Sequence, residues 1–272
     1  MVTASVVLFN TQKQHIDTLL KCIIPSCVEK LYIIDNSFND RWREIENLSE
    51  KLRYIHNKNI GYGASHNLAI HLAVESGSNF HLIMNPDIRF EPGVLEELRN
   101  VMNENEDVVY ILPKVVDING EVQYLCKLLP TPEDLIFRRF IPAKGLLKKW
   151  KEKKNARYCL MDSGYDKVIN PPCLSGCFMF MRLSAITNND IFFDEDFFMY
   201  FEDFDLIRRL HRIGKTIYYP EVVIIHDHAR ESYKNYKMLK VHIKSAIHYF
   251  NKYGWVFDKE RRKMNEQILK EL

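Results

Sequence analysis

Residues 80–87 read Phe80-His81-Leu82-Ile83-Met84-Asn85-Pro86-Asp87. The first five are mostly apolar and predict a short buried strand. The next three residues form a turn that Pro86 stiffens, and this turn presents the carboxylate of Asp87 at the end of the strand. Taken alone, Asn85-Pro86-Asp87 is also suitable for an ordinary β-turn. The significance of Asp87 therefore depends on what else the fold brings to that edge of the sheet.

Other apolar runs in the first half predict further strands, most of them separated by helical patterns. These runs are Ala4–Phe9, Leu31–Asp35, Leu52–His56 and Val108–Leu112. Their alternation with helices predicts an α/β fold with a mainly parallel sheet covered on both faces. Polar residues follow the strands at their carboxyl ends, the edge at which open α/β sheets bind ligands.

The second half of the chain has a different pattern. Lys114–Leu125 contains the turn Ile118-Asn119-Gly120-Glu121 and predicts a hairpin. Further strands are predicted at Cys177–Arg182, Thr216–Tyr219 and Val222–His226, a helix over Leu206–Ile213 closed by Gly214, and an amphipathic helix over Tyr233–Tyr253 that packs on the core. One domain with a C-terminal helical extension is the simplest division.

Composition and charge set broad limits on function. The 272 residues carry a formal net charge of +2, which provides no global steering field. Six scattered cysteines without a Cys-x-x-Cys pair argue against a structural zinc site and are expected to be reduced. The chain shows no secretory signal and no apolar run of the ~18 to 20 residues that a spanning helix requires, so we expect a cytoplasmic protein.

The segment from Arg138 to Arg157 contains nine Lys or Arg residues and one Glu. Apolar residues, among them Trp150, are interleaved with this charge. The pattern suits peripheral contact with an anionic membrane surface, and it equally suits a solvated surface loop.

A stretch of acidic and aromatic residues, Phe193–Asp205, precedes the predicted helix at 206. Burial beside aromatic rings raises the pKa of a carboxyl group, which makes it a better base for removing a proton from a sugar hydroxyl. Acidic residues in a first helical turn, here Glu202, Asp203 and Asp205, also stabilise the helix dipole. Both roles can apply to different members of the stretch.

The segment Asn59-Ile60-Gly61-Tyr62-Gly63-Ala64-Ser65-His66-Asn67 precedes a second predicted helix. Glycines there permit close approach of the backbone to a ligand, and the helix N-terminus favours an anion. Neither a Walker loop nor a Gly-x-Gly-x-x-Gly motif is present. The segment by itself is a weak indication of phosphate binding.

Seven motifs together resemble the family 2 inverting glycosyltransferases, and most of all their rhamnosyltransferase-like branch. They are Val6–Asn10, Ile33–Ser37, Asn59–Asn67, Asn85–Asp87, Ser175–Met179, Phe201–Asp205 and His226, in the order and approximate spacing of that family. The resemblance implies a GT-A, Rossmann-like fold with a mainly parallel central sheet. It divides the chain into a GT-A domain at 1–232, with a nucleotide-binding half at 1–114 and an acceptor and catalytic half at 115–232, and a helical extension at 233–272.

The resemblance also implies the residues of a nucleotide-sugar site. The nucleotide contacts are Asn10, Asp35, Asn36, Asn59, Gly61 and Asn67. The segment around Gly176 lies beneath the donor sugar, and Asn85 stands where many relatives carry an additional acid. Arg230 is a candidate clamp for phosphate.

Asp87 matches the metal ligand of the family's Asp-x-Asp motif, with His226 as the second ligand of Mg²⁺ or Mn²⁺. Side chains alternate along a strand, so His228 shares a face with His226 and either could be the ligand; the family position favours His226. Asp203 matches the general base, and Glu202 its neighbour that positions acceptor or donor.

The resemblance implies transfer of a sugar from dTDP-rhamnose or a UDP-hexose to a hydroxyl of a glycan or lipid-linked acceptor, in cell-surface polysaccharide synthesis at the inner face of the plasma membrane. No nucleic acid partner is expected. A sugar nucleotidyltransferase would carry a basic, glycine-rich loop after the first strand, where this chain has Asn10-Thr11-Gln12-Lys13. An inactive nucleotide-sugar-binding module would have lost the base or the metal ligands, which are present.

Overall fold

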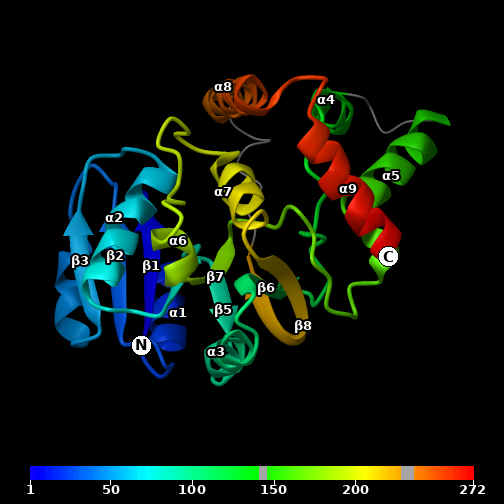
Figure 1. The fold of residues 1–272 in the computed structure, drawn as a ribbon. Helices are drawn as coiled ribbons and strands as arrows, with labels where there is room; N and C mark the ends of the chain where they lie inside the picture. Colours follow the sequence, from blue (N-terminus) through cyan, green and yellow to red (C-terminus); the bar gives the residue numbers. More distant parts are fainter. Residues whose placement is uncertain (141–145, 228–235) are drawn as a thin grey trace.

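The computed structural model describes residues 1–140, 146–227 and 236–272, except for the side chains of residues 137–140, 146 and 147 (Figure 1). The strands are β1 (Val2–Leu8), β2 (Lys30–Asp35), β3 (Leu52–His56), β4 (Phe80–Met84), β5 (Ile88–Phe90), β6 (Val108–Val116), β7 (Phe178–Arg182) and β8 (Lys215–His226). The α-helices are α1 (Lys13–Ile23), α2 (Tyr62–Glu75), α3 (Val94–Glu104), α4 (Pro132–Phe140), α5 (Leu146–Tyr158), α6 (Leu183–Thr187), α7 (Glu202–Leu210), α8 (Tyr236–Tyr253) and α9 (Lys259–Glu271), with 3₁₀ turns η1 (Arg43–Leu48) and η2 (Met161–Ser163).

The strands form one sheet in the order β3-β2-β1-β4-β7-β6-β8-β5. β1 is parallel to β2 and β4, and β6 is parallel to β8, while β7 is antiparallel to both of its neighbours. The prediction of an α/β fold with a mostly parallel sheet and C-terminal helices is confirmed. Because β7 lies between β4 and β6, the two predicted halves of the domain share this one sheet.

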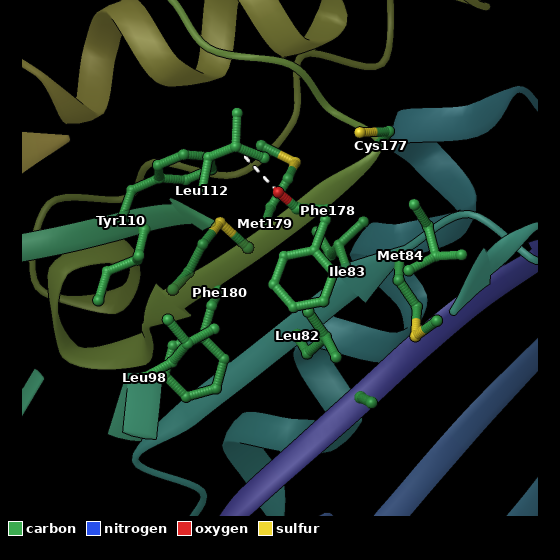
Figure 2. Close-up of a cluster of buried hydrophobic side chains, with 14 of the residues drawn as sticks. Leu82, Ile83, Met84, Leu98, Tyr110, Leu112, Cys177, Phe178, Met179 and Phe180 are labelled. Carbon is green, nitrogen blue, oxygen red and sulfur yellow. Dashed lines mark hydrogen bonds between the residues drawn. The ribbon is translucent and has the colours of Figure 1, made fainter. Parts of the chain in front are cut away.

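Helices cover the central part of the sheet, because almost all residues of β1, β2, β4, β6 and β7 are buried on both faces. α2 packs on β1, β2 and β4, and α7 packs on β6 and β8 and against α2. α3 packs on the same two strands as α7. Figure 2 shows part of the core, in which Leu82 of β4, Leu98 of α3, Tyr110 of β6, and Phe178 and Phe180 of β7 belong to one cluster of buried side chains.

Two strand predictions needed correction. The runs Thr216–Tyr219 and Val222–His226 form the single strand β8, which shifts register against β6 near Pro220. Proline has no N–H for the ladder, so the strand bends there and remains paired. The predicted hairpin at Lys114–Leu125 is shorter than expected, because its first residues belong to β6 and only Val116 and Val122 form a bridge across the turn.

The helix predictions hold in part. α7 begins at Glu202, so the acidic residues do occupy a first helical turn. The predicted C-terminal helix is present from Tyr236, and the first three residues of the predicted range lie outside the described part. The basic segment is helical at both ends, in α4 and α5, and not a loop there, while the described lysines of α5 are exposed to solvent or partly so; its residues 141–145 are not described. None of the helices in the described ranges is long and apolar enough to cross a membrane.

Candidate functional site

The turn Asn85–Asp87 crosses the carboxyl edge of the sheet. It carries the chain from β4, near the middle of the sheet, to β5 at its outer edge. β5 then runs antiparallel to β8, with Ile88 opposite His226. Asp87 therefore lies beside the last residue of β8, although the two are far apart in sequence. The same edge receives the ends of β1 and β2 and the start of β7.

Asp87 and His226 form the pair that was expected to hold a cation. The Oδ1 atom of Asp87 lies 3.5 Å from Nε2 of His226. Gln123 holds the imidazole from its other side: its amide nitrogen donates to the His226 carbonyl at 2.8 Å, and its Oε1 lies 3.1 Å from Nδ1. Because the first bond orients the amide, Nδ1 must be the donor in the second. The Nε2 atom is thereby left to face Asp87.

The donor set fits a divalent cation. One carboxylate and one imidazole leave several positions to phosphate oxygens, as Mg²⁺ and Mn²⁺ require. Burial alone would lower the pKa of His226, but Cys177 and Asp87 outweigh burial and raise the pKa to about 10. In the protein alone a proton on Nε2 thus stands between the two side chains. A cation bound there would replace that proton.

Asp203 is held as a carboxylate at the start of α7. Its Oδ2 accepts from the backbone N–H of Gly176 at 3.1 Å, and its Oδ1 accepts from the N–H of Phe204 at 2.9 Å. Burial raises the pKa of Asp203 above its ordinary value, while Lys127 and the backbone donors oppose the rise. The side chain remains partly exposed, so it can reach a ligand. These are the properties of a general base.

Glu202 differs from its neighbour. Its side chain is buried, and its Oε2 has no hydrogen-bond partner among the described residues. Burial and the charge of Asp203 raise the pKa of Glu202 well above its ordinary value. Asp203 accepts two backbone hydrogen bonds that stabilise its charged form, whereas Oε2 of Glu202 accepts none from the described residues, which favours Glu202 as the proton donor of the pair. A protonated Glu202 can donate a hydrogen bond to a bound hydroxyl.

Tyr62 joins the two ends of the site. Its hydroxyl lies 3.1 Å from Oδ1 of Asn85 and 3.0 Å from the carbonyl oxygen of Gly176. The N–H of Asn85 in turn donates to the carbonyl of Cys177 at 2.9 Å. The turn bearing Asp87 and the segment contacting Asp203 are therefore one hydrogen-bonded unit. Tyr62 was not predicted as a site residue, although its place between two glycines at a helix start is a signal that the sequence carries.

Gly176 is required by this arrangement. A Cβ atom at this position would lie 2.8 Å from Cβ of Asp203, closer than such atoms approach. The glycine therefore allows the helix start to sit directly against the segment before β7. The sequence analysis placed this segment beneath the donor sugar, and the structure places it against the carboxylate of Asp203.

The residues expected to contact the nucleotide lie at the ends of β1 and β2. Asp35 is fully buried and accepts from the hydroxyl of Tyr54 and the N–H of Ser37. Asn36 donates to Ser65, and its buried Oδ1 has no partner in the described ranges. Asn10 is exposed beside them. Asn36 Oδ1 is thus a buried acceptor left unsatisfied by the described residues, whereas Asp35 positions the strand end.

Asn59, Gly61 and Asn67 hold a loop. The Oδ1 atom of Asn59 accepts from the N–H of Gly61 at 3.2 Å. Gly61 has φ +102°, and a Cβ there would lie 2.4 Å from the carbonyl oxygen of Phe198. Asn67 donates to and accepts from the backbone of Phe193. The glycine was predicted to let the backbone approach a ligand closely. In the structure Gly61 instead approaches the segment before α7, and Asn59, Gly61 and Asn67 hold that segment above the site.

A second group of potential ligands lies away from this pair. Within 236–272 and the other described parts, Asp194, Asp196 and His248 bring one ligand atom each to within 4.8 Å of one another. The ammonium group of Lys252 lies 2.5 Å from Asp194, a contact that competes with a cation. Arg230 and His228, which were also considered as site residues, lie outside the described residues.

Comparison with solved structures finds the same fold in TarS of S. aureus. The TarS 1–349 complex with UDP-GlcNAc matches with a TM-score of 0.62 and 14% identity, over 98% of this chain and 71% of that one. Its complex with UDP matches with a TM-score of 0.60 and 14% identity, over 98% and 70%. A longer TarS structure matches at 0.60 and 16% identity, and this chain spans 42% of its length. The fold is therefore the GT-A fold. No family model and no curated protein matches the sequence.

Proposed function

We propose that this protein is an inverting glycosyltransferase that moves a sugar from a nucleoside diphosphate sugar to an acceptor hydroxyl. The observation that carries the proposal is the hydrogen-bonded unit in which Tyr62 and Gly176 connect the Asn85–Asp87 turn to Asp203. It puts a candidate ligand for a diphosphate-bound cation and a candidate base on one sheet edge. A shared fold with a protein that was solved with UDP-GlcNAc supports this assignment.

The reaction is a single displacement. Asp203 takes the proton of the acceptor hydroxyl, the hydroxyl oxygen forms a bond to the anomeric carbon, and the bond from that carbon to the diphosphate oxygen breaks on the opposite face. The nucleoside diphosphate leaves with the bonding electrons, and the configuration at carbon inverts. Glu202, which holds its proton, donates a hydrogen bond to a hydroxyl of acceptor or donor and so fixes its position.

Asp87 and His226 would hold the cation, and Gln123 would orient the imidazole toward it. When bound, Mg²⁺ or Mn²⁺ neutralises the charge of the diphosphate and so stabilises the leaving group. Asn10 and Asn36 would contact the base and ribose. Arg230 remains a candidate contact of the phosphates.

For the donor we propose a UDP-hexose or dTDP-rhamnose, and for the acceptor a glycan or lipid-linked hydroxyl in cell-surface polysaccharide synthesis. The test is a panel of nucleotide sugars assayed for metal-dependent hydrolysis and for a shift of the melting temperature. The expected result is stabilisation by one of these donors with Mn²⁺ present. A panel without any stabilising nucleotide sugar would contradict the proposal.

Two variants separate binding from chemistry. Asp203→Asn should reduce transfer ~10²- to 10⁴-fold and leave donor binding intact, because it removes only the base. Asp87→Ala should weaken binding of the donor itself in the presence of Mn²⁺. Asp162→Asn, an exposed acid of η2 outside the site, is the matched control and should transfer as the parent does. A fully active Asp203→Asn protein would refute the mechanism.

A further inference from the structure

One side of α8 packs on the core as predicted, and the flank next to it is both apolar and basic. Tyr249 and Phe250 are buried against Phe197 and Phe201. On the flank beside Phe250, Ile243 and Ile247, one turn apart, are each 43% exposed. The helix carries four lysines and no aspartate or glutamate. The exposed part of the helix therefore carries both apolar and basic side chains.

An apolar groove of about 260 Å³ runs beside this helix. Ile136 of α4, Ile243 and Ile247 of α8, and Trp255 line it. The residues that follow extend the apolar surface, since Val256 is 72% and Phe257 is 93% exposed. Three consecutive large apolar residues at the surface are unusual unless something covers them. We call the exposed side of α8, this groove and residues 255–257 the α8 face.

The charge around the α8 face indicates what covers it. Lys240 and Lys244 are exposed on the same side of α8 as the isoleucines. Lys240 also lies over the ring of Tyr236, 5.0 Å from its centroid. Exposed isoleucines flanked by lysines, with aromatic residues at the rim, are typical of helices that lie in a membrane interface. The partner must be apolar beneath and anionic at its surface.

We propose that the α8 face docks on the surface of an anionic lipid bilayer. The isoleucines and residues 255–257 enter the boundary between headgroups and acyl chains, and the lysines contact lipid phosphates. α5, which packs against α4 and carries most of the lysines of the basic segment, adds positive charge nearby. Membrane contact of residues 138–157 was predicted from their charge and stays a prediction; the present proposal rests on the exposed apolar side chains of the α8 face.

The α8 face is connected to the catalytic helix. Phe250 lines the groove and packs on Phe201, the residue directly before Glu202 and Asp203. A protein docked in this way holds α7 close to the bilayer surface. If the proposed glycosyl transfer is correct, this position suits an acceptor anchored in lipid; docking itself does not depend on that function.

The test is co-flotation of the full chain with vesicles of phosphatidylcholine, with and without 30% phosphatidylglycerol. We expect binding to the anionic vesicles that weakens as salt rises, because the charge contribution is screened. Lys244→Glu should lower the partition coefficient about fivefold or more. Lys21→Glu, an exposed lysine on α1, makes the same change of charge away from this face and should have little effect.

The apolar contribution is tested with Ile243→Ser and Ile247→Ser combined. Both positions are exposed, so the variant should fold, and binding should fall at least tenfold. Leu48→Ser, 63% exposed beside β3, is the matched control and should bind as the parent does. Tryptophan emission should shift to the blue on vesicle binding in the parent and not in Trp255→Phe.

Three results would overturn the proposal. The first is equal binding to neutral and anionic vesicles, or to neither. The second is binding that survives the isoleucine double variant and is lost in Lys149→Glu combined with Lys153→Glu, which would assign the contact to α5. The third is a dimer of the parent, without vesicles, that the isoleucine double variant abolishes, because the α8 face would then join two copies of the chain.

Discussion

Acid should destabilise this protein through two histidines buried beneath the site. His81 of β4 and His66 of α2 both lie within 2.8 Å of the hydroxyl of Ser5, and Thr3 bonds the other nitrogen of His81. Both imidazoles are fully buried. Burial lowers the pKa of His81 to about 3, and burial together with His81 lowers the pKa of His66 well below its ordinary value.

The magnitude follows from the difference between the folded and unfolded states. An unfolded histidine titrates near a pKa of ~6.5, so stability from a neutral buried histidine is present above that pH and is lost as pH falls toward 3. For His81 alone the loss relative to neutral pH is about 1.4 kcal/mol at pH 5.5 and about 2 kcal/mol at pH 5.0. His66 adds a loss of the same sign.

The assay is urea unfolding of the parent and of His81→Gln at pH 7.5, 6.5, 5.5 and 5.0. The variant should be less stable at pH 7.5, because glutamine reproduces the hydrogen bonds imperfectly. Its deficit should shrink by about 2 kcal/mol by pH 5.0, since it has one histidine fewer to protonate on unfolding. Contributions of carboxyl groups are common to both proteins and cancel in the difference.

The control is Asn100→Gln, an exposed change on α3 that leaves the number of titratable groups unchanged, and its difference from the parent should stay constant with pH. The reasoning is refuted if the deficit of His81→Gln is the same at pH 5.0 as at pH 7.5, or if it grows on acidification. Either result would mean that His81 is no less readily protonated in the folded protein than in the unfolded chain.

Three further outcomes are expected. Arg208→Ala should destabilise by about 3 to 5 kcal/mol in urea unfolding, because it leaves the buried Asp258 without the two 2.7 Å bonds that tie α7 to the start of α9; a loss below ~1 kcal/mol would contradict this. Gln123→Ala should weaken Mn²⁺ binding ~10- to 100-fold in a calorimetric titration, since the contact that orients His226 through Nδ1 is then lost; unchanged affinity would exclude the positioning role. Gly176→Ala should abolish transfer while the protein still unfolds cooperatively, because its methyl group displaces the proposed base, and an active variant would show that the contact can yield.

The α/β class and the edge that bears the site were predictable because they depend on local patterns. Continuous apolar runs such as Leu31–Asp35 form buried strands wherever they occur, and parallel strands present their carboxyl ends together. This is why Asp35, Asn36 and Asp87 could be expected at one edge. β5 could not be predicted, because three residues have no periodicity and Ile88–Phe90 becomes a strand only by pairing with β8.

The partners of the site residues depend on contacts between distant segments. Gln123 follows a turn and has no recognisable pattern, yet it bonds to a histidine 103 residues away. Gly61 was expected beside a ligand because of its backbone freedom, and Asn67 because of its polar side chain. The structure uses the same properties to hold residues 193–198, more than 120 positions along the chain.

The sequence by itself determined that this protein has a mainly parallel sheet with acids and amides at its carboxyl edge, because hydrophobic periodicity and turn chemistry act over a few residues. Only the tertiary structure decided which of those groups meet. It placed Asp87 beside His226 by pairing β5 with β8, and it set Asp203 against Gly176 where no Cβ intervenes. Such contacts depend on the packing of strands and helices that are far apart in the sequence, and patterns over a few residues do not specify that packing.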